Sequence, residues 1–321
     1  MFRWVMLGAG NIANTFARTV REMDGHEVAA VASKSQARAE KLALTHGIPR
    51  FFDDYEEMLE SVPADAAYIS VTVNDHARLT QMCVRHGIPV LCEKAMFRSF
   101  DEARKTFDLA AERHVFTMEG TWSLFLPANL TARRWLEDGR IGSCQDMQVS
   151  IGFQPEMDPS SRYFSRTLGG GCARDITVYA YELSRFFLGG PMEEMEVEAW
   201  GCETGVDIEN RIRMNLGGIR VLLHTSFRAP DMEEQLVITG EKGSIQIPHP
   251  HYASRAFLRS PEGKVLDTFD DPASASFRWE ILEVERNVRG GKLESPVVPH
   301  GLTLSCAGLF DLIEEKLRSE G

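Results

Sequence analysis

Apolar and polar residues alternate along the start of the chain with a spacing that switches between that of a strand and that of a helix. Residues 2–7 form an apolar run that ends at Gly8, and residues 11–23 carry apolar side chains at helical spacing. A second apolar run at residues 26–33 precedes a more polar helical segment at residues 37–46. Because this strand, helix, strand order needs a crossover connection, it predicts a parallel sheet.

The same alternation continues to about residue 118. Residues 1–120 are therefore predicted to form a Rossmann domain, which is a doubly wound parallel α/β sheet. The further predicted strands lie at residues 66–71, 89–92 and 115–118, and the further predicted helices at residues 77–86 and 100–113.

From about Trp122 the pattern changes to short alternating strands. Residues 121–321 are predicted to form a C-terminal α+β domain with a large, mostly antiparallel open sheet. Helices would cover one face of this sheet and a second copy of the chain would cover the other, giving a homodimer or higher homo-oligomer. The predicted strands lie at residues 146–153, 196–202, 211–214, 221–226 and 236–239, and the predicted helices at residues 132–136, 176–187 and 302–317.

Composition and charge narrow the class of protein. The chain has 321 residues and a formal net charge of −12, which argues against nucleic acid as a partner. No apolar run reaches the roughly 20 residues of a membrane span, and the N-terminus lacks a signal-peptide layout, so we expect a cytoplasmic protein without a membrane partner. The six cysteines are scattered, and an exposed turn is a better interpretation of His249 and His251 than a metal site. No metal is expected.

A glycine turn follows the first predicted strand, with the sequence Gly8, Ala9, Gly10, Asn11, Ile12 and Ala13. In such a turn the first glycine permits the tight bend and the second lets the backbone approach a diphosphate. The small Ala13 lets the next helix pack close to the strand, so that the helix N-terminus faces the phosphates. Between a strand and an amphipathic helix, this pattern predicts dinucleotide binding.

The end of the second predicted strand favours one dinucleotide over the other. Enzymes that select NAD commonly place a carboxylate there to bind the ribose 2′-hydroxyl. This chain instead has Ser33 and Lys34, with Arg38 nearby, and these side chains suit a 2′-phosphate. We therefore expect NADP in preference to NAD. The alternative is that Lys34 and Arg38 belong to a solvated helix face.

Glu93 and Lys94 directly follow the predicted strand at residues 89–92. Ligands of open α/β sheets bind at the carboxyl ends of the strands, so Lys94 is expected to face the crevice. There it can donate a hydrogen bond to a substrate hydroxyl and stabilise developing alkoxide charge. The alternative is a surface charge pair at the end of a strand.

Asp175 and Tyr179 lie four residues apart at the start of the predicted helix at residues 176–187, hence on one face, after three glycines. A tyrosine phenol can give and take a proton, and a neighbouring carboxylate can orient a substrate hydroxyl. The alternative is structural, with Asp175 capping the helix and Tyr179 packing in the core.

These segments resemble the glucose-fructose oxidoreductase and inositol dehydrogenase family (Gfo/Idh/MocA). The family hallmark EKP corresponds here to Glu93, Lys94 and Ala95, so Lys94 matches the family's lysine and Ala95 stands in place of its proline. The resemblance extends through VTVNDHARLTQMCVRHGIPVLCEK. It implies that Glu93 and Lys94, together with Thr72, Asn74 and His76, contribute to the cofactor site near the nicotinamide ribose.

Tyrosine at position 179 and the stretch MEGTWSLFLPANLTARRWLEDGRIG are most similar to the dihydrodiol dehydrogenase and NADP-dependent D-xylose 1-dehydrogenase branch. The resemblance implies that Tyr179 is the acid/base, Lys94 its partner and Asp175 a substrate-orienting carboxylate. Four aromatic side chains are candidates for the substrate pocket, although core packing is the alternative for each. They are Trp122, Phe153, Phe277 and Trp279.

The expected activity is an NADP-dependent transfer of hydride between the nicotinamide and a carbinol or carbonyl carbon of a sugar, cyclic polyol or trans-dihydrodiol. The reacting group would be CH–OH, or the CH–CH bond of a dihydrodiol. Two alternatives stay open: a non-catalytic NADP-binding regulatory sensor, and an inositol or other sugar dehydrogenase that uses NAD.

Overall fold

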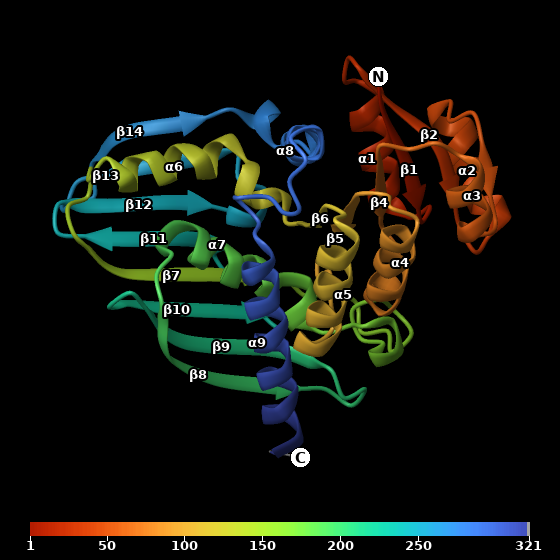
Figure 1. Cartoon of the computed structure of the whole chain (residues 1–321). Coiled ribbons are helices and arrows are strands. Elements are labelled where there is room, and N and C mark those ends of the chain that lie inside the picture. Colours follow the sequence, from red (N-terminus) through yellow and green to blue (C-terminus); the bar gives the residue numbers. More distant parts are fainter. Residues whose placement is uncertain (320–321) are drawn as a thin grey trace. The chain divides into compact units, whose positions relative to one another are not determined.

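The computed structural model describes residues 1–319 of the chain and contains two compact units, each described here by itself (Figure 1). The first unit comprises Met1–Gly120 together with Phe277–Leu304. The second comprises Thr121–Ser276 and the residues from Ser305 onward. The first division of the chain, after Gly120, coincides with the change in the hydrophobic pattern.

A late segment of the chain completes the first unit, whereas the sequence pattern assigned all of residues 121–321 to one domain. Helix α8 (Arg278–Arg289) belongs to this segment. Its Glu285 carboxylate lies 3.2 Å from the His26 ring of the first sheet, and Arg278 donates to the carbonyl of Glu22 at 3.4 Å. An amphipathic helix carries no mark in its sequence of which core it packs against, and for this reason the pattern did not predict the return.

The first unit contains a six-stranded parallel sheet in the order β3-β2-β1-β4-β5-β6. The order reverses between the neighbours β1 and β4, which makes this position the topological switch point where doubly wound folds bind ligands. The predicted Rossmann class is confirmed, although β3 and α3 were not predicted. The strands are β1 (Phe2–Leu7), β2 (His26–Ala32), β3 (Phe51–Phe52), β4 (Ala66–Ile69), β5 (Val90–Glu93) and β6 (Thr117–Gly120), and the helices are α1 (Asn11–Arg21), α2 (Gln36–His46), α3 (Tyr55–Ser61), α4 (Val73–Arg85) and α5 (Phe100–Arg113).

The second unit contains an eight-stranded sheet in the order β14-β13-β12-β11-β7-β10-β9-β8. Strands β7 and β10 pair in parallel and the other described neighbours pair antiparallel, which confirms the predicted mostly antiparallel sheet. Strands β12, β13 and β14 were not predicted. The strands are β7 (Cys144–Gly152), β8 (Met192–Gly201), β9 (Asp207–Leu216), β10 (Ile219–Ser226), β11 (Gln235–Gly240), β12 (Gly243–Pro248), β13 (Arg255–Arg259) and β14 (Val265–Asp270).

Helices cover one face of this sheet (Figure 1). Helix α6 (Pro127–Glu137) packs on β12 and β13, and α7 (Val178–Leu188) packs on β7 and β10. Side chains of β10 alternate accordingly, with Val221 and Leu223 buried and Leu222 exposed between them. The last helix, α9 (His300–Ser319), begins in the first unit and continues in the second. The short helical turns are η1 (Trp122–Phe125), η2 (Arg166–Leu168), η3 (Ala173–Thr177), η4 (Pro250–Tyr252) and η5 (Pro272–Ser274).

Two further features bear on the class of protein. Through residue 319, the described helices are all too short or too polar to cross a membrane. All six cysteines are free thiols.

Candidate functional site

The glycine turn between β1 and α1 is an open cradle at the switch point. Gly8 has a φ of 117°, and a Cβ built on it would lie 2.8 Å from the carbonyl carbon and oxygen of Ser70 at the end of β4. Gly10, the N-cap of α1, has no atom within 4 Å of an equivalent Cβ. Thus Gly8 is required by the fold itself, whereas Gly10 leaves space for a ligand to approach the backbone.

The N-terminus of α1 also has the electrostatics of an anion site. No side chain caps it, and its first turn contains no acidic residue. The side chains of Asn11 and Ile12 are exposed and Ala13 is fully buried against the sheet. Free backbone N–H groups and the helix dipole favour a phosphate at such an end. The turn therefore fits the diphosphate of a dinucleotide.

The residues after β2 are those from which a preference for NADP was predicted. Ser33 is buried and its hydroxyl accepts from the N–H of Ser35 at 3.3 Å. Lys34 Nζ lies 2.7 Å from a carboxylate oxygen of Asp75 on α4, while Arg38 is exposed in the first turn of α2. Lys34 thus has an acidic partner that the sequence pattern did not indicate.

Asp75 is the centre of a small charge cluster. Burial opposes its ionisation, but Lys34 and Arg78 outweigh burial and hold the pKa of the Asp75 carboxyl below its usual value. A cavity of about 370 Å³ lies beside this cluster in the first unit. Its lining residues are Lys34, Asp53, Asp54, Tyr55, Glu56, Arg78 and Met82.

Lys94 follows directly on β5 and is partly exposed. The Lys94–Ala95 peptide bond is cis, and Ala95 is fully buried. The backbone beyond Lys94 is held on two sides: the Ala95 carbonyl lies 2.9 Å from His76 Nδ1, and the Met96 N–H donates to Glu119 Oε1 at 2.7 Å. The segment that carries Lys94 is therefore fixed by the core of the first unit.

The His76 ring is buried and bonds to the backbone of this segment. The ring is 1% exposed, and its two nitrogens lie 2.9 Å from the Ala95 carbonyl and 3.0 Å from the Val71 carbonyl. Burial lowers the pKa of His76, so the ring is neutral near neutral pH and its single N–H donates to one carbonyl at a time. Two residues earlier, Asn74 Oδ1 accepts from the hydroxyl of Thr72, the N-cap of α4, at 2.6 Å.

A pair of buried carboxyl groups lies behind Lys94. Glu93 accepts from the Tyr68 hydroxyl at 2.6 Å, and burial raises the pKa of its carboxyl. Glu280 of α8 is 1% exposed, and neither carboxyl oxygen has a hydrogen-bond partner among the described residues. Burial and the nearby Glu93 raise the pKa of Glu280 well above its usual value. Glu280 therefore favours its protonated form more strongly than an exposed glutamate does.

In the second unit, Asp175 and Tyr179 do not lie on one regular α-helix, as the sequence predicted. Residues Ala173–Thr177 form a π-turn in which the N–H of Val178 bonds to the Ala173 carbonyl, and α7 begins only at Val178. Turns of this kind occur frequently at functional sites. The predicted four-residue spacing therefore does not describe how the two side chains are related.

Each of these two side chains has a partner in the second unit. Arg162 Nη1 lies 2.9 Å from Asp175 Oδ1, and its other guanidinium nitrogen donates to the Tyr163 hydroxyl at 2.8 Å. The indole N–H of Trp122 donates to the Tyr179 hydroxyl oxygen at 3.3 Å. Tyr179 is thus a mostly buried phenol whose oxygen accepts a hydrogen bond from a donor that cannot itself ionise.

Two residues that contact Tyr179 or Asp175, His251 and Arg162, were not found from the sequence. The His251 ring lies with its centroid 5.5 Å from the Tyr179 ring, and His251 comes from the turn η4. Its only signal was the HPH motif, which gave no link to a residue 72 positions earlier in the chain. Arg162 lies in the long connection after β7 and had no signal at all.

The predicted pocket aromatics separate into two groups. Phe153 packs edge-on against Tyr163 and Phe227, with ring centroids 5.6 and 5.1 Å apart. Phe277 and Trp279 lie in the first unit instead of the second, Phe277 buried and Trp279 exposed. The indole N–H of Trp122 meets a predicted site residue, Tyr179.

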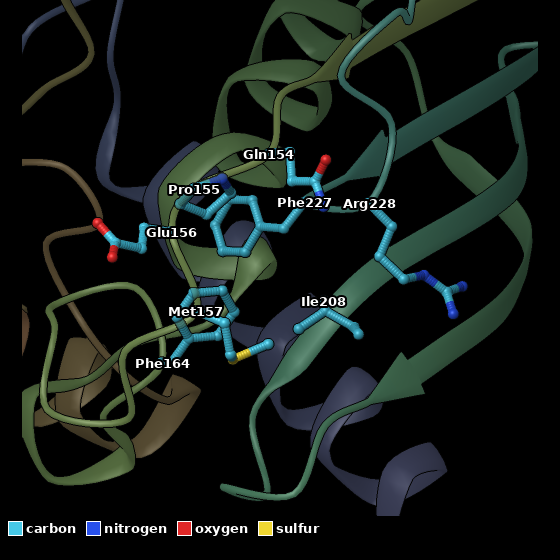
Figure 2. A pocket seen from close by; sticks show the side chains of 8 residues that line it. All are labelled: Gln154, Pro155, Glu156, Met157, Phe164, Ile208, Phe227 and Arg228. Atoms are coloured by element: carbon cyan, nitrogen blue, oxygen red, sulfur yellow. The ribbon is translucent and has the colours of Figure 1, made fainter.

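Phe227 also lines a cavity of about 490 Å³ in the second unit (Figure 2). Its walls are apolar and aromatic, and Glu156 and Arg228 stand at opposite ends of it (Figure 2). The lining residues are Gln154, Pro155, Glu156, Met157, Phe164, Ile208, Phe227 and Arg228.

Two family models match the chain. One is described as the oxidoreductase family with an NAD-binding Rossmann fold and matches residues 2–121. The other is described as the GFO/IDH/MocA C-terminal domain and matches residues 129–246. The two matches fall on the two parts of the chain that the sequence pattern distinguished.

Similar proteins span the whole chain. Trans-1,2-dihydrobenzene-1,2-diol dehydrogenase from Danio rerio is 28% identical over 328 residues, covering 99% of this chain and 97% of the relative. Among solved structures, aldose-aldose oxidoreductase from Caulobacter crescentus matches with a TM-score of 0.88 at 19% identity and covers 100% of this chain and 98% of its own. KijD10, a 3-ketoreductase from Actinomadura kijaniata in complex with TDP-benzene and NADP, matches with a TM-score of 0.84 at 21% identity and covers 97% and 96% of the two chains. At such identities the solved structures support the fold.

Proposed function

Since the chain belongs to the Gfo/Idh/MocA family of NAD(P)-binding oxidoreductases, we propose that it is a dehydrogenase that uses NADP(H) to oxidise a carbinol carbon, or reduce the corresponding carbonyl, of a sugar, cyclic polyol or trans-dihydrodiol. The observation that carries the proposal is the hydrogen bond from the Trp122 N–H to the phenol oxygen of Tyr179. This hydrogen bond stabilises negative charge on the phenol oxygen. A proton acceptor in alcohol oxidation needs such charge.

The glycine turn and the N-terminus of α1 would hold the diphosphate of the cofactor, since Gly10 leaves its backbone accessible. When bound, the nicotinamide accepts or supplies the hydride. Lys34 and Arg38 would hold the 2′-phosphate of NADP. Thr72, Asn74 and Glu93 are proposed to act near the nicotinamide ribose, with His76 fixing the backbone around them.

In oxidation, the substrate hydroxyl proton passes to the phenolate oxygen of Tyr179 as the hydride leaves the carbinol carbon. Trp122 stabilises that oxygen before the transfer, and the ammonium of Lys94 stabilises the substrate oxygen as it gains charge. Asp175, held by Arg162, accepts a hydrogen bond from a second substrate hydroxyl. Lys94 belongs to the first unit and Tyr179 to the second.

The substrate class rests on these groups and on the names of the similar proteins. Asp175 and Arg162 together offer an acceptor and a donor, which suits a molecule with neighbouring hydroxyl groups. A relative across nearly the whole chain is named as a dihydrodiol dehydrogenase, and a structural neighbour as an aldose oxidoreductase. We expect a cytoplasmic homodimer, as inferred from the sequence.

The test is a panel of aldoses, inositols and trans-dihydrodiols, assayed with NADP and with NAD by the absorbance of the reduced nicotinamide. The proposal predicts turnover with at least one vicinal diol or sugar. Tight NADP binding without turnover of any member of the panel would contradict it and favour a regulatory sensor.

Cofactor selectivity has its own test in Lys34→Ala. A charge-assisted bond to a phosphate contributes about 1.5–3 kcal/mol, so KM for NADP is expected to rise roughly tenfold or more, with KM for NAD nearly unchanged. Lys41→Ala is the matched control, because Lys41 is an exposed lysine on α2, the helix that follows Lys34. Equal effects of Lys34→Ala on NADP and NAD would contradict the assignment of Lys34 to the 2′-phosphate.

A further inference from the structure

A cluster of buried polar side chains lies beneath the π-turn that carries Asp175. It comprises Asp207 and Asn210 of β9, Thr225 of β10 and Thr177 of the turn itself. Asp207 is 3% exposed and the other three side chains are fully buried. Burying an ionisable group and three polar groups is costly unless they bond to one another or to the backbone, so each contact in the cluster matters.

Asp207 bonds to the start of the π-turn. Its Oδ2 accepts from the backbone N–H of Ala173 at 2.6 Å and from Asn210 Nδ2 at 2.6 Å. The residue in the N-cap position, Cys172, supplies no side-chain cap. Asp207 therefore supplies the cap from a neighbouring strand, where the helix dipole favours a carboxylate.

Gly171 explains how a strand residue can reach this backbone. Its φ is 118°, and a Cβ on it would overlap Asp207 Oδ1. Only glycine leaves the space that Asp207 occupies. One member of the glycine run before Asp175 thus serves this contact, a purpose that the sequence pattern did not reveal.

The other end of the π-turn is bonded to the same cluster. Thr177 Oγ1 lies 2.6 Å from Thr225 Oγ1 and accepts from Asn210 Nδ2 at 3.2 Å. Because Asn210 bonds to both Asp207 and Thr177, the cluster connects the first and last residues of the turn. Asp175 lies between these two fixed points, and Tyr179 lies two residues beyond the second.

We propose that Asp207, Asn210 and Thr225 are positioning residues that hold the π-turn in register and so set the orientation of Asp175 and Tyr179 for the reaction. This inference rests on the proposed function, because it gives the two side chains their role. The cluster acts only through the backbone of the turn, so its loss leaves the cofactor residues of the first unit untouched.

The decisive experiment is a double-mutant cycle between Asp207→Ala and Asp175→Asn, measured as kcat/KM for the diol or sugar substrate. A displacement of a reacting group by about 1 Å can cost on the order of 100-fold, so Asp207→Ala is expected to lower kcat/KM by about 10–100-fold. If Asp207 acts through the turn, the double variant loses much less than the product of the two single losses. The dissociation constant of NADP is expected to stay at the wild-type value.

Hydrogen exchange gives a readout that needs no substrate. In Asp207→Ala, amides of residues 173–178 are expected to exchange faster, while those of residues 184–188 stay as protected as in the wild type. Ser184→Ala is the matched control, since Ser184 is a buried hydroxyl on α7 that bonds only to the Ala180 carbonyl, at 2.7 Å. Thr225→Val, which removes one hydroxyl at nearly constant volume, replaces Asp207→Ala if the latter does not fold.

The outcomes distinguish the positioning role of the cluster from the proposed function. Unchanged exchange at residues 173–178, or kcat/KM losses that multiply independently, would overturn the positioning role of the cluster. Absence of turnover in the wild-type protein would overturn the proposed function, and the exchange measurement would still decide whether the cluster holds the turn.

Discussion

Tyr179 and Tyr68 differ in the hydrogen bond that the phenol oxygen makes. Trp122 donates its indole N–H at 3.3 Å, and the His251 ring lies 5.5 Å away between centroids. By contrast, Tyr68 donates its own proton to Glu93 and is fully buried. A phenol whose oxygen accepts a hydrogen bond ionises more readily than one that donates to a carboxylate, and the resulting phenolate can receive the substrate proton.

Trp122→Phe tests this difference. The variant keeps an aromatic ring and removes the N–H, so kcat is expected to fall by about 3- to 10-fold, which corresponds to the ~1 kcal/mol of an ordinary hydrogen bond. The loss should be larger at lower pH, where the phenolate that lacks its donor is protonated first. The measurement is the pH profile of kcat.

Trp200→Phe is the comparison for that variant, because Trp200 lies on β8 and packs against Arg211. It is expected to leave kcat and the pH profile unchanged. A Trp122→Phe profile that matches the Trp200→Phe profile would rule out a role for the indole N–H.

Single residues could be proposed as site candidates from the sequence where they lie in a local motif. Gly8, Lys94 and Tyr179 each lie in a short pattern, and the family resemblance that these patterns supported is confirmed. Arg162 and His251 were not predictable, because each meets its partner through the tertiary fold. Their roles become visible only when distances are known.

At the scale of elements, the β1–α1 turn separates two uses of glycine. Gly8 has a positive φ and no room for a Cβ beside Ser70, whereas Gly10 has a φ of −90° and open space. Gly8→Ala is therefore expected to lower the free energy of unfolding by about 1–3 kcal/mol. Gly10→Ala is expected to fold normally but to bind NADP at least tenfold more weakly, because its methyl group enters the space where the diphosphate approaches.

Thermal unfolding and NADP titration of the two variants measure these effects separately. If Gly10→Ala bound NADP as tightly as the wild type, the turn would not be the diphosphate site.

Glu280 of helix α8 is expected to make the free energy of unfolding depend on pH. Burial and Glu93 raise the pKa of this carboxyl from its usual 4.5, so the folded protein holds a proton that the unfolded chain releases. The stability contributed by this proton is fully present below about pH 4.5 and is lost as the pH rises through the folded-state pKa. Glu280→Gln removes this loss of stability at high pH, because the glutamine side chain has no carboxyl group to ionise.

The expected result for Glu280→Gln is a higher free energy of unfolding than wild type at pH 8, by about 1 kcal/mol or more, with the difference shrinking toward pH 5. Denaturant unfolding across this pH range is the measurement. Glu27→Gln, at an exposed position of β2, is the control and should show no such trend. A constant difference between wild type and Glu280→Gln at all pH values would contradict the linkage.

Regular elements were predictable from periodicity, and irregular ones were not. Most strands of both sheets and helices α1, α2, α4, α5 and α9 were anticipated, because each repeats its pattern over several residues. The π-turn was not, since Ala173–Thr177 differs from an α-helix by a single added residue per turn that leaves no trace in hydrophobicity. Asp207 and Asn210, which bond to its two ends, are more than 30 residues away in the chain.

At the scale of the whole molecule, two separate segments of the chain form the first unit. The change of pattern near Gly120 was visible in the sequence, but the return of Phe277–Leu304 was not, because long-range packing decides it. The consequence for function is that the proposed machinery is divided: the dinucleotide turn and Lys94 belong to one unit, while Asp175 and Tyr179 belong to the other. The proposal thus assigns residues of both units to substrate chemistry and residues of the first unit to the dinucleotide.

The turnover number of Tyr179→Phe and of Lys94→Ala, each saturated with NADP and the best diol or sugar of the panel, tests this account most directly. General acid–base catalysis is worth about 100- to 10,000-fold, so each variant is expected to lose kcat by at least 100-fold, and Tyr179→Phe is expected to bind NADP with the wild-type dissociation constant. Near-wild-type kcat in either variant would contradict the assignment of hydride-transfer chemistry to these two residues.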